Sequence, residues 1–349
     1  AQWNPADRMR LYVRKDIAAK IWSYGVGASA EAQQAVDPYA SGKLAVAPVL
    51  AIGSEGNGAG LFNAPRGVAF AADGSFYVAD SRNHRIQHFS AAGELLNVFG
   101  EMTPLDPNTT QPLADAPAGT FTEPWGVAVG PDGSVYVSDT WNHRIQKFDA
   151  DGNFIAAWGR FGQSGVLDEM WGPRGIAVSA TGRVFVADTG NKRVIVFDEQ
   201  GNGVTAIGSY GFEDGQLDEP VGVAVGADGA VYVADTWNQR VQKFVPQVLA
   251  GEGVETYVFV LKIDVNGWFG QSLDNKPFVA VDGQGRIYIT DPEGFRLVVF
   301  GPDGVYRNTI GEAGDQLLTL LSAVAVADDG TVLVSEPGAN RVITFAPLP

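Results

Sequence analysis

The chain has 349 residues, of which 45% are apolar and 18% are charged, with no cysteine and a formal net charge of −16. Affinity for nucleic acid rests mainly on Lys and Arg neutralising phosphates, so this acidic balance argues against RNA or DNA as the main partner. The missing cysteines exclude disulfides, thiolate catalysis and Cys-ligated metal sites. No apolar run approaches the roughly 18 residues of a membrane-spanning helix.

Residues 1–42 are predicted as a helix and a linker ahead of the main domain. Asn4, Pro5 and Asp7 predict the helix start, because Asn caps the first turn, Pro fits within it and an acid suits its positive end. Apolar residues then recur at helical spacing among five Lys and Arg. Two interpretations stay open. Either the helix packs against the main domain, or residues 1–24 form a basic amphipathic segment that lies near a membrane.

One segment recurs along the rest of the chain. It reads YVADSRNHRIQHF from Tyr77, YVSDTWNHRIQKF from Tyr136, FVADTGNKRVIVF from Phe185 and YVADTWNQRVQKF from Tyr232, with looser copies from Tyr288 and Leu333. An acidic residue ends the first half of each copy: Asp80, Asp139, Asp188, Asp235, Asp291 and Glu336. Successive acids lie 45 to 59 residues apart, a period that fits one four-stranded β-propeller blade per copy.

The strands of each unit can be placed from its glycine turns. Four short apolar runs separated by these turns predict an antiparallel meander, whose strands we call a to d from the axis outward. The last copy ends at strand c, residues 341–345, whereas residues 47–53 look like a strand d with no other strand before it. Pairing these two segments removes an open sheet edge. We therefore predict an all-β fold: a six-bladed β-propeller of four-stranded antiparallel blades over residues 43–349, closed by an N-terminal strand.

These units resemble NHL repeats over residues 43–349. Four copies keep the Asp-x-x-Asn-x-Arg-[Ile/Val] core of that repeat, on Asp80, Asn83 and Arg85; Asp139, Asn142 and Arg144; Asp188, Asn191 and Arg193; and Asp235, Asn238 and Arg240. The fifth copy has Gly294 in place of the Asn, and the sixth has Glu336 and an extra residue before Asn340. The resemblance implies a rigid binding platform. Related propeller enzymes are amidating lyases, which hold a metal with His in the central cavity, and lactonases, which hold one with Glu, Asn and Asp near the axis.

The repeated polar residues are interpreted as architecture, because Asp and Asn side chains stabilise tight turns by bonding to the backbone. His84, His88 and His143 are interpreted as ordinary surface residues, since the repeat position of the first and third holds Lys192 and Gln239 in the next blades. The predicted a strands contain no titratable residue, so they offer no group for acid–base catalysis. No catalytic residue is assigned, and enzymatic activity is not favoured.

Aromatic and arginine residues predict a ligand-binding face. In a propeller the d–a and b–c loops meet on one face around the channel mouth, and Trp and Arg are enriched in binding hot spots. The candidate residues are Arg66, Arg82, Trp125, Trp141, Trp171, Arg174 and Trp237. The alternative is that loop aromatics such as Phe161, Phe212 and Phe269 fill gaps between blades. The longest insertion, residues 101–124, is predicted to be a loop on the same face.

Acidic pairs in the d–a loops are the candidates for a bound metal. They are Asp168 and Glu169, Glu213 and Asp214, and Asp218 and Glu219. They lack the alternating spacing of a calcium loop, so solvated charge is favoured over Ca²⁺ and no cofactor is expected.

These observations favour a non-catalytic propeller that binds a glycan, protein or peptide at the channel mouth. We expect it to be the extracytoplasmic or cell-surface part of a larger, membrane-associated bacterial protein, processed or trimmed because it starts with Ala. One alternative is a metal-dependent hydrolase or lyase of the lactonase or amidating-lyase type. The other is a structural or self-assembling surface domain.

Overall fold

The computed structural model describes residues 37–109, 113, 115–163, 165–248, 255–265, 268 and 276–349. Within this part of the chain, Tyr39–Pro349 belong to one compact unit. The helix predicted over residues 1–24 lies outside the described residues. Within the ranges given above, no helix is long and apolar enough to cross a membrane.

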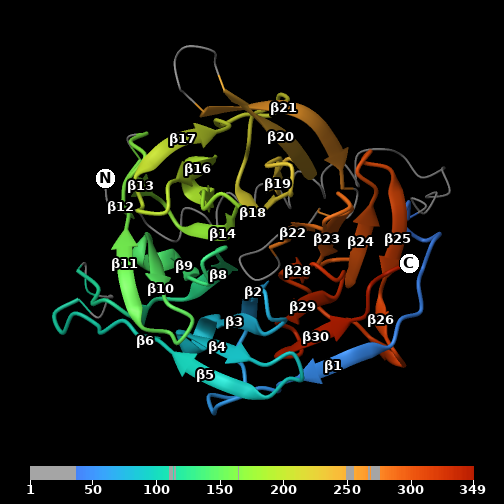
Figure 1. Cartoon of the computed structure of the whole chain (residues 1–349), viewed down its shortest axis with the longest axis horizontal. Helices are drawn as coiled ribbons and strands as arrows, with labels where there is room; N and C mark the ends of the chain where they lie inside the picture. The colour runs from blue at the N-terminus through green and yellow to red at the C-terminus, as the bar shows by residue number, and fades with distance from the viewer. Residues whose placement is uncertain are drawn as a thin grey trace, which may run out of the picture. The chain divides into compact units, whose positions relative to one another are not determined.

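Six four-stranded antiparallel sheets are arranged around a common axis, which confirms the predicted fold (Figure 1). Blade 1 holds β2 (Pro65–Phe70), β3 (Phe76–Asp80), β4 (Arg85–Phe89) and β5 (Leu95–Phe99). Blade 2 holds β8 (Pro124–Val129), β9 (Val135–Asp139), β10 (Arg144–Phe148) and β11 (Phe154–Trp158). Blade 3 holds β14 (Pro173–Val178), β15 (Val184–Asp188), β16 (Arg193–Phe197) and β17 (Gly203–Ile207).

The remaining blades follow the same plan. Blade 4 holds β18 (Pro220–Val225), β19 (Val231–Asp235), β20 (Arg240–Val248) and β21 (Glu255–Asp264). Blade 5 holds β22 (Val279–Val281), β23 (Ile287–Asp291), β24 (Arg296–Phe300) and β25 (Tyr306–Ile310). Blade 6 holds β28 (Val324–Val326), β29 (Val332–Glu336), β30 (Arg341–Phe345) and, as its outer strand, β1 (Pro48–Ile52).

The ring is closed by β1, as predicted. This strand pairs antiparallel with β30, with Pro48 opposite Phe345 and Ile52 opposite Val342. The first strand in the described chain therefore completes the last blade, and its pairing covers the backbone groups that β30 would otherwise expose.

Short elements connect the blades. Two parallel ladders, β6 (Glu101–Met102) with β7 (Thr120–Phe121) and β12 (Arg160–Phe161) with β13 (Glu169–Met170), lie in d–a connections. A third, antiparallel ladder joins β26 (Glu312–Ala313) and β27 (Gln316–Leu317). The b–c turns of the first three blades contain 3₁₀ turns, η1 (Ser81–Asn83), η2 (Thr140–Asn142) and η3 (Thr189–Asn191). The 101–124 insertion therefore begins and ends in a parallel ladder.

Side chains of the inner strands pack between blades. In β2, Val68 belongs to a buried cluster with residues of blade 6, whereas its neighbour Ala69 belongs to another cluster with Val127 of blade 2. This alternation follows from the pleat of a strand, which sends successive side chains to opposite faces. The apolar character of the a strands is thus required for packing between blades. Because these side chains pack between blades, their lack of titratable groups is not evidence against catalysis elsewhere in the protein.

The glycine that begins each Gly-Val-Ala-Val run makes room for the next blade. A Cβ on Gly126 would lie 2.3 Å from the carbonyl oxygen of Arg174, and one on Gly175 would lie 2.3 Å from the carbonyl oxygen of Val221. A larger residue in place of Gly126 or Gly175 would therefore push neighbouring inner strands apart. In blades 5 and 6 this position holds Phe278 and Ala323, which are buried in one cluster.

Candidate functional site

A buried carboxylate organises the turn between strands b and c in each blade. In blade 2, Asp139 accepts hydrogen bonds from the backbone N–H of Thr122 (2.8 Å), Asn142 Nδ2 (2.8 Å), Arg144 Nε (2.9 Å) and Gln146 Nε2 (3.1 Å). The same acid–Asn–Arg arrangement is formed by Asp80, Asn83 and Arg85, by Asp188, Asn191 and Arg193, and by Asp235, Asn238 and Arg240. Blades 5 and 6 keep an acid–Arg pair, Asp291 with Arg296 and Glu336 with Arg341. In blades 1 to 4 and in blade 6 the acid also accepts a backbone N–H of the preceding d–a loop, which ties the b–c turn to that loop.

Two of the three histidines link neighbouring blades. His84 Nδ1 accepts the backbone N–H of Glu123 at 3.1 Å, and His143 Nδ1 accepts that of Gly172 at 3.0 Å. Burial lowers the pKa of both rings, to about 4 for His143, so both are neutral at pH 7. Asn340 plays the same part in blade 6, where its Oδ1 accepts the N–H of Ala64 at 2.8 Å. The interpretation of these His as ordinary surface residues is therefore wrong.

Three of the predicted binding residues contact one another on the inner strands of blades 1 to 3. Arg66, Trp125 and Arg174 are the second residues of β2, β8 and β14, and their exposed fractions are 3%, 1% and 3%. The guanidinium carbon of Arg66 is 3.7 Å from the centroid of the Trp125 ring, and that of Arg174 is 4.5 Å from it. Such contacts with an aromatic ring stabilise a cation, most strongly where water is excluded.

The other predicted residues lie apart from this group. Trp141 donates from Nε1 to Glu123 Oε2 at 3.2 Å, and Trp171 packs so closely over Gly190 that a Cβ there would meet its ring at 2.4 Å. Arg82 is exposed in the b–c turn of blade 1. Trp237 lies near a lysine of blade 5, with Lys276 Nζ 5.9 Å from its ring centroid. The predicted face therefore divides into a buried inner group and a set of outer positions.

A second buried ionic group lies at the same end of the blades. Lys276 Nζ is 3.3 Å from Glu219 Oε2, and Lys192 Nζ is 3.5 Å from Glu219 Oε1 and 3.1 Å from Asp218 Oδ1. Lys276 is only 1% exposed. The assignment of Asp218 and Glu219 to solvated charge is therefore wrong, because both are buried and paired with lysines.

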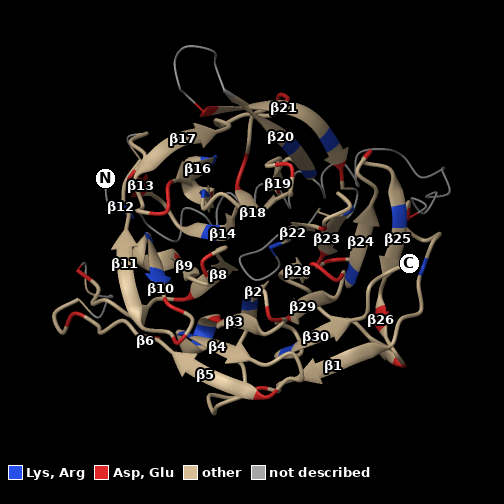
Figure 2. Ribbon diagram, viewed as in Figure 1, with Lys and Arg blue, Asp and Glu red and all other residues tan. Residues whose placement is uncertain are grey.

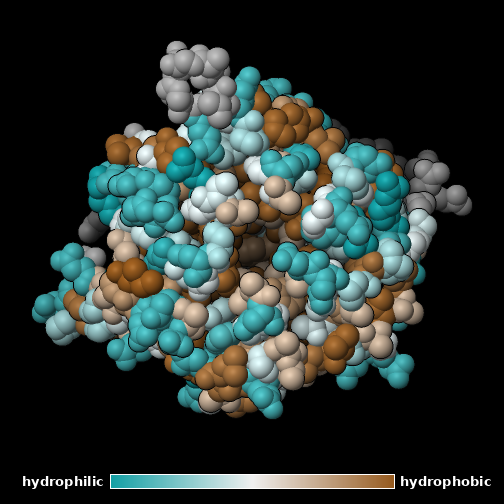
Figure 3. All heavy atoms as spheres, viewed as in Figure 1, coloured by the Kyte–Doolittle hydropathy of each residue, from teal (hydrophilic) through white to brown (hydrophobic). Residues whose placement is uncertain are grey.

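Sequence reasoning missed Lys276. A signal was present, because Lys276 directly precedes Pro277 at the start of a blade, as Glu219 precedes Pro220. Figure 2 shows basic segments of β2 and β14 and another beside β22 around the centre of the ring, with acidic residues next to β18. Figure 3 shows that one face of the molecule is hollowed at this centre.

The described residues do not fit a metal centre of the lyase or lactonase kind. Across the ranges given for the fold, no group of three His, Asp or Glu side chains comes together in a way that could hold an ion. His84 and His143 also use their Nδ1 atoms as acceptors for backbone N–H groups of the next blade.

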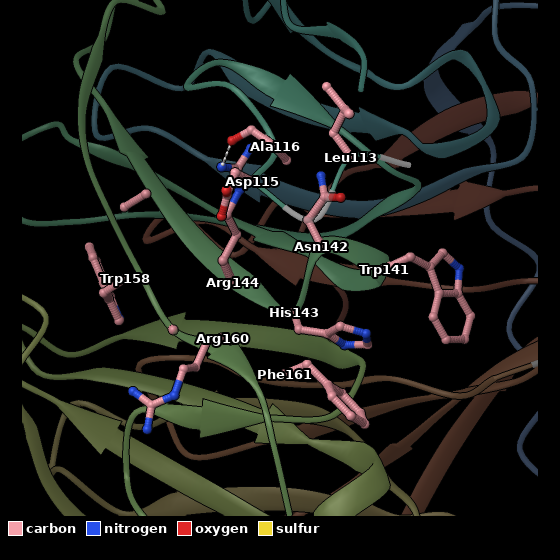
Figure 4. A pocket seen from close by; sticks show the side chains of 12 residues that line it. Leu113, Asp115, Ala116, Trp141, Asn142, His143, Arg144, Trp158, Arg160 and Phe161 are labelled. Carbon is pink, nitrogen blue, oxygen red and sulfur yellow. Dashed lines mark hydrogen bonds between the residues drawn. The ribbon is translucent and has the colours of Figure 1, made fainter. Parts of the chain in front are cut away.

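A separate groove of about 650 Å³ lies beside blade 2, lined by its b–c turn, by residues of the 101–124 insertion and by the connection that follows β11. His143 and Phe161 lie side by side in it, with ring centroids 4.9 Å apart, whereas Trp141 points away from them (Figure 4). Arg144 lies on its opposite side and donates to the carbonyl oxygen of Ala116 at 2.6 Å. The groove thus combines an aromatic wall with a polar wall, and the arginine of the polar wall is also hydrogen-bonded to Asp139 of the b–c turn.

The sequence model of the NHL repeat matches residues 62–89, 121–148, 170–197 and 217–244, one segment in each of blades 1 to 4. These segments are NHL repeats. The matched blades are the four that keep the whole Asp–Asn–Arg network. Blades 5 and 6, outside the matched segments, keep the four-stranded fold with altered b–c turns.

Relatives of the NHL propeller include amidating enzymes. A probable peptidyl-α-hydroxyglycine α-amidating lyase of Caenorhabditis elegans is 31% identical over 102 residues, which cover 28% of this chain and 26% of the relative. The peptidyl-glycine α-amidating monooxygenase of Mus musculus is 36% identical over 110 residues, which cover 30% of this chain and 10% of the relative. The matches thus span about a quarter of these relatives or less.

Solved structures support the fold. A structure assigned as a gluconolactonase superimposes with a TM-score of 0.57 at 15% identity, covering 86% of this chain and 93% of the other. At this identity the likeness concerns the fold alone.

Proposed function

We propose that this NHL propeller is an enzyme of the lyase or hydrolase class, with its active site at the mouth of the central channel. The observation that carries the proposal is the buried ionic group there, Glu219 with Lys276 beside Lys192. The Asp–Asn–Arg network explains the buried charges of the b–c turns, but it does not use Glu219 or Lys276. Buried ionisable groups with specific charge partners are enriched in active sites.

The relatives suggest the reaction. The nematode relative is named for a lyase that acts on peptidyl-α-hydroxyglycine, a peptide whose last residue carries a hydroxyl and a carboxylate on one carbon. In this chain, the Glu219 carboxylate accepts the hydroxyl proton while the C–N bond breaks. The Lys276 ammonium protonates the departing nitrogen, and the products are a peptide amide and glyoxylate. The proton then returns from Glu219 to Lys276 across their 3.3 Å contact.

The test is an assay of glyoxylate release from an α-hydroxyglycine peptide, followed by a panel of simple lactones, with and without a chelator. We expect the wild type to turn over substrate. Glu219→Gln should lower kcat by a factor of about 10²–10⁴, because a positioned general base accelerates a reaction by about that factor. Glu213→Gln is the control, since Glu213 is exposed in the same loop. A wild type inactive on every substrate, or a Glu219→Gln variant as active as wild type, contradicts the proposal.

A second candidate is non-catalytic binding of a glycan or peptide, as favoured from the sequence. The groove beside blade 2 supports it, because the neighbouring rings of His143 and Phe161 offer an aromatic wall. A glycan and peptide array should then give ligands whose binding falls for Phe161→Ala. Equal binding by the variant and the wild type would exclude this groove.

A further inference from the structure

We propose that Lys192 is a positioning residue, which holds the carboxylate of Glu219 ionised and fixed in place beside Lys276. The inference deepens the proposed function and rests on it for the role of Glu219 as general base. It concerns the regulation of that base: Lys192 sets the pH range in which Glu219 can accept a proton, and it takes no part in the bond changes.

The first argument is the geometry of the carboxylate, which has one lysine at each oxygen. Lys276 Nζ is 3.3 Å from Glu219 Oε2, and Lys192 Nζ is 3.5 Å from Glu219 Oε1. A cation this close to a carboxyl group favours its ionised form. Because the two lysines approach different oxygens, they also restrain the orientation of the carboxylate. A general base needs both properties, the ionised form and a defined direction.

The second argument is that Lys192 is itself held by the neighbouring blade. Its ammonium group is 3.1 Å from Asp218 Oδ1, and the backbone N–H of Asp218 donates to Asp235 Oδ1 at 2.7 Å. Asp235 is the buried acid of the b–c network of blade 4. A continuous series of contacts therefore joins the repeat architecture to Lys192 and, through Lys192, to Glu219.

The third argument comes from the residue that other blades have in place of Lys192. The same repeat position holds His84, His143 and Asn340 in blades 1, 2 and 6, where each side chain accepts a backbone N–H from the segment leading into the next blade. An ammonium group has donors only, so Lys192 cannot form this bond. Blade 3 makes ion pairs at the position where these blades make a structural hydrogen bond. Departures from a local structural rule are expected at functional sites.

An acid at the position of Glu219 is not sufficient to make the same group. Glu123 also stands immediately before the proline of an inner strand, but it lies next to His84, whose ring is neutral at pH 7. The Glu123 carboxylate accepts a hydrogen bond from Trp141 Nε1 at 3.2 Å, and no ion pair in the described part of the chain includes it. The lysine on the preceding blade is therefore the feature that distinguishes Glu219.

The experiment is a carbon-13 NMR titration of the glutamate carboxyl groups in the full chain, with the Glu219 signal assigned by its absence in Glu219→Gln. Lys192→Gln should raise the pKa of Glu219 by about one pH unit or more, because an adjacent cation lowers the pKa of a carboxyl group by about 1–3 units. Lys192→Arg keeps the charge and should leave this pKa close to that of the wild type. Asp218 and Lys276, the other charged groups described beside Glu219, are the same in each variant.

The control is Lys262→Gln, which removes a lysine of blade 4 that is paired with Asp214 at 3.1 Å and should not change the pKa of Glu219. The fold should accept Lys192→Gln, because Gln239 occupies the same repeat position in blade 4. If that variant fails to fold, Lys192→His restores the residue of blades 1 and 2 and provides the same comparison. In the glyoxylate assay, the acidic limb of kcat/KM should move to higher pH with the pKa of Glu219.

An unchanged pKa of Glu219 in Lys192→Gln would overturn the inference, and so would an equal rise in Lys192→Arg or in Lys262→Gln. The titration needs no turnover, so the two proposals can fail separately. The expected pKa changes without turnover of any substrate would refute the catalytic proposal alone. Turnover by the wild type, with a pKa of Glu219 that Lys192→Gln leaves unchanged, would refute the role of Lys192 alone.

Discussion

The histidine between blades 2 and 3 predicts a specific dependence of stability on pH. His143 Nδ1 accepts the N–H of Gly172, and protonation would place a second donor against that N–H. Burial lowers the pKa of His143 from 6.5 to about 4 in the folded protein. The unfolded chain therefore binds more protons between these two values, so stability is lost as the pH falls from 7 towards 4 and then stays level.

The magnitude follows from the two pKa values. A pKa of 6.5 in the unfolded chain and about 4 in the folded protein corresponds to a loss of about 2 kcal/mol in the free energy of unfolding between pH 7 and pH 5. Because the ring is only partly buried, solvent screening reduces this loss to about 1–2 kcal/mol. The variant His143→Asn keeps an acceptor and tolerates the left-handed backbone, with φ of 56° at this position. Asn340 shows that an Asn forms the same interblade bond in blade 6.

The measurement is urea unfolding of wild type and His143→Asn at pH 7 and pH 5. The wild type should lose about 1–2 kcal/mol more than the variant, and contributions of the other titrating groups cancel in this difference. Gln239→Asn is the control, because Gln239 occupies the same repeat position without a titrating ring. An identical loss in wild type and His143→Asn would refute the reasoning, since the His143 ring would then titrate alike in both states.

Two further predictions test the architecture. Gly126→Ala should lower the free energy of unfolding by about 1–3 kcal/mol, because its Cβ would lie 2.3 Å from the carbonyl oxygen of Arg174. The control Gly283→Ala should change stability little, because the space around Gly283 is open. Equal changes in the thermal unfolding temperature of the two variants would contradict this prediction. Asp139→Asn should cost about 3–5 kcal/mol in urea unfolding because it leaves the largely buried guanidinium of Arg144 without its counter-charge. The control is Asp303→Asn in the exposed Asp303–Arg307 pair, which should cost about 1 kcal/mol or less. A similar cost for Asp139→Asn and Asp303→Asn would show that the buried network does not stabilise the blade.

Part of the candidate site was visible in the sequence. Arg66, Trp125 and Arg174 stand immediately before the glycine of their inner strands, so the repeat register places them at one end of the ring. The register could not show that two guanidiniums contact one indole, because contacts between blades depend on side-chain rotamers. Lys276 was missed for a related reason: the fifth unit departs from the repeat pattern where the chain enters β22.

Local signals determined the blades of this protein. Glycine turns, alternating apolar runs and an Asp–Asn–Arg core recur once per unit, and an antiparallel meander depends only on neighbours along the chain, so strand order and blade number follow from the sequence. Even the pairing of β1 with β30 could be predicted, because each segment lacks the partner that the other supplies.

Tertiary structure alone decided which side chains are buried and with what partners. Glu219 and Asp218 resemble other acidic loop pairs in the sequence, yet they are buried beside lysines of neighbouring segments. His84 and His143 occupy a repeat position that holds Lys or Gln in other blades. In the structure, however, each ring accepts a hydrogen bond from the backbone of the segment that leads into the following blade. The physical reason is that the closed ring brings side chains from different blades into contact. Whether such a side chain is buried, and which charge lies beside it, therefore depends on the neighbouring blade as well as on its own repeat.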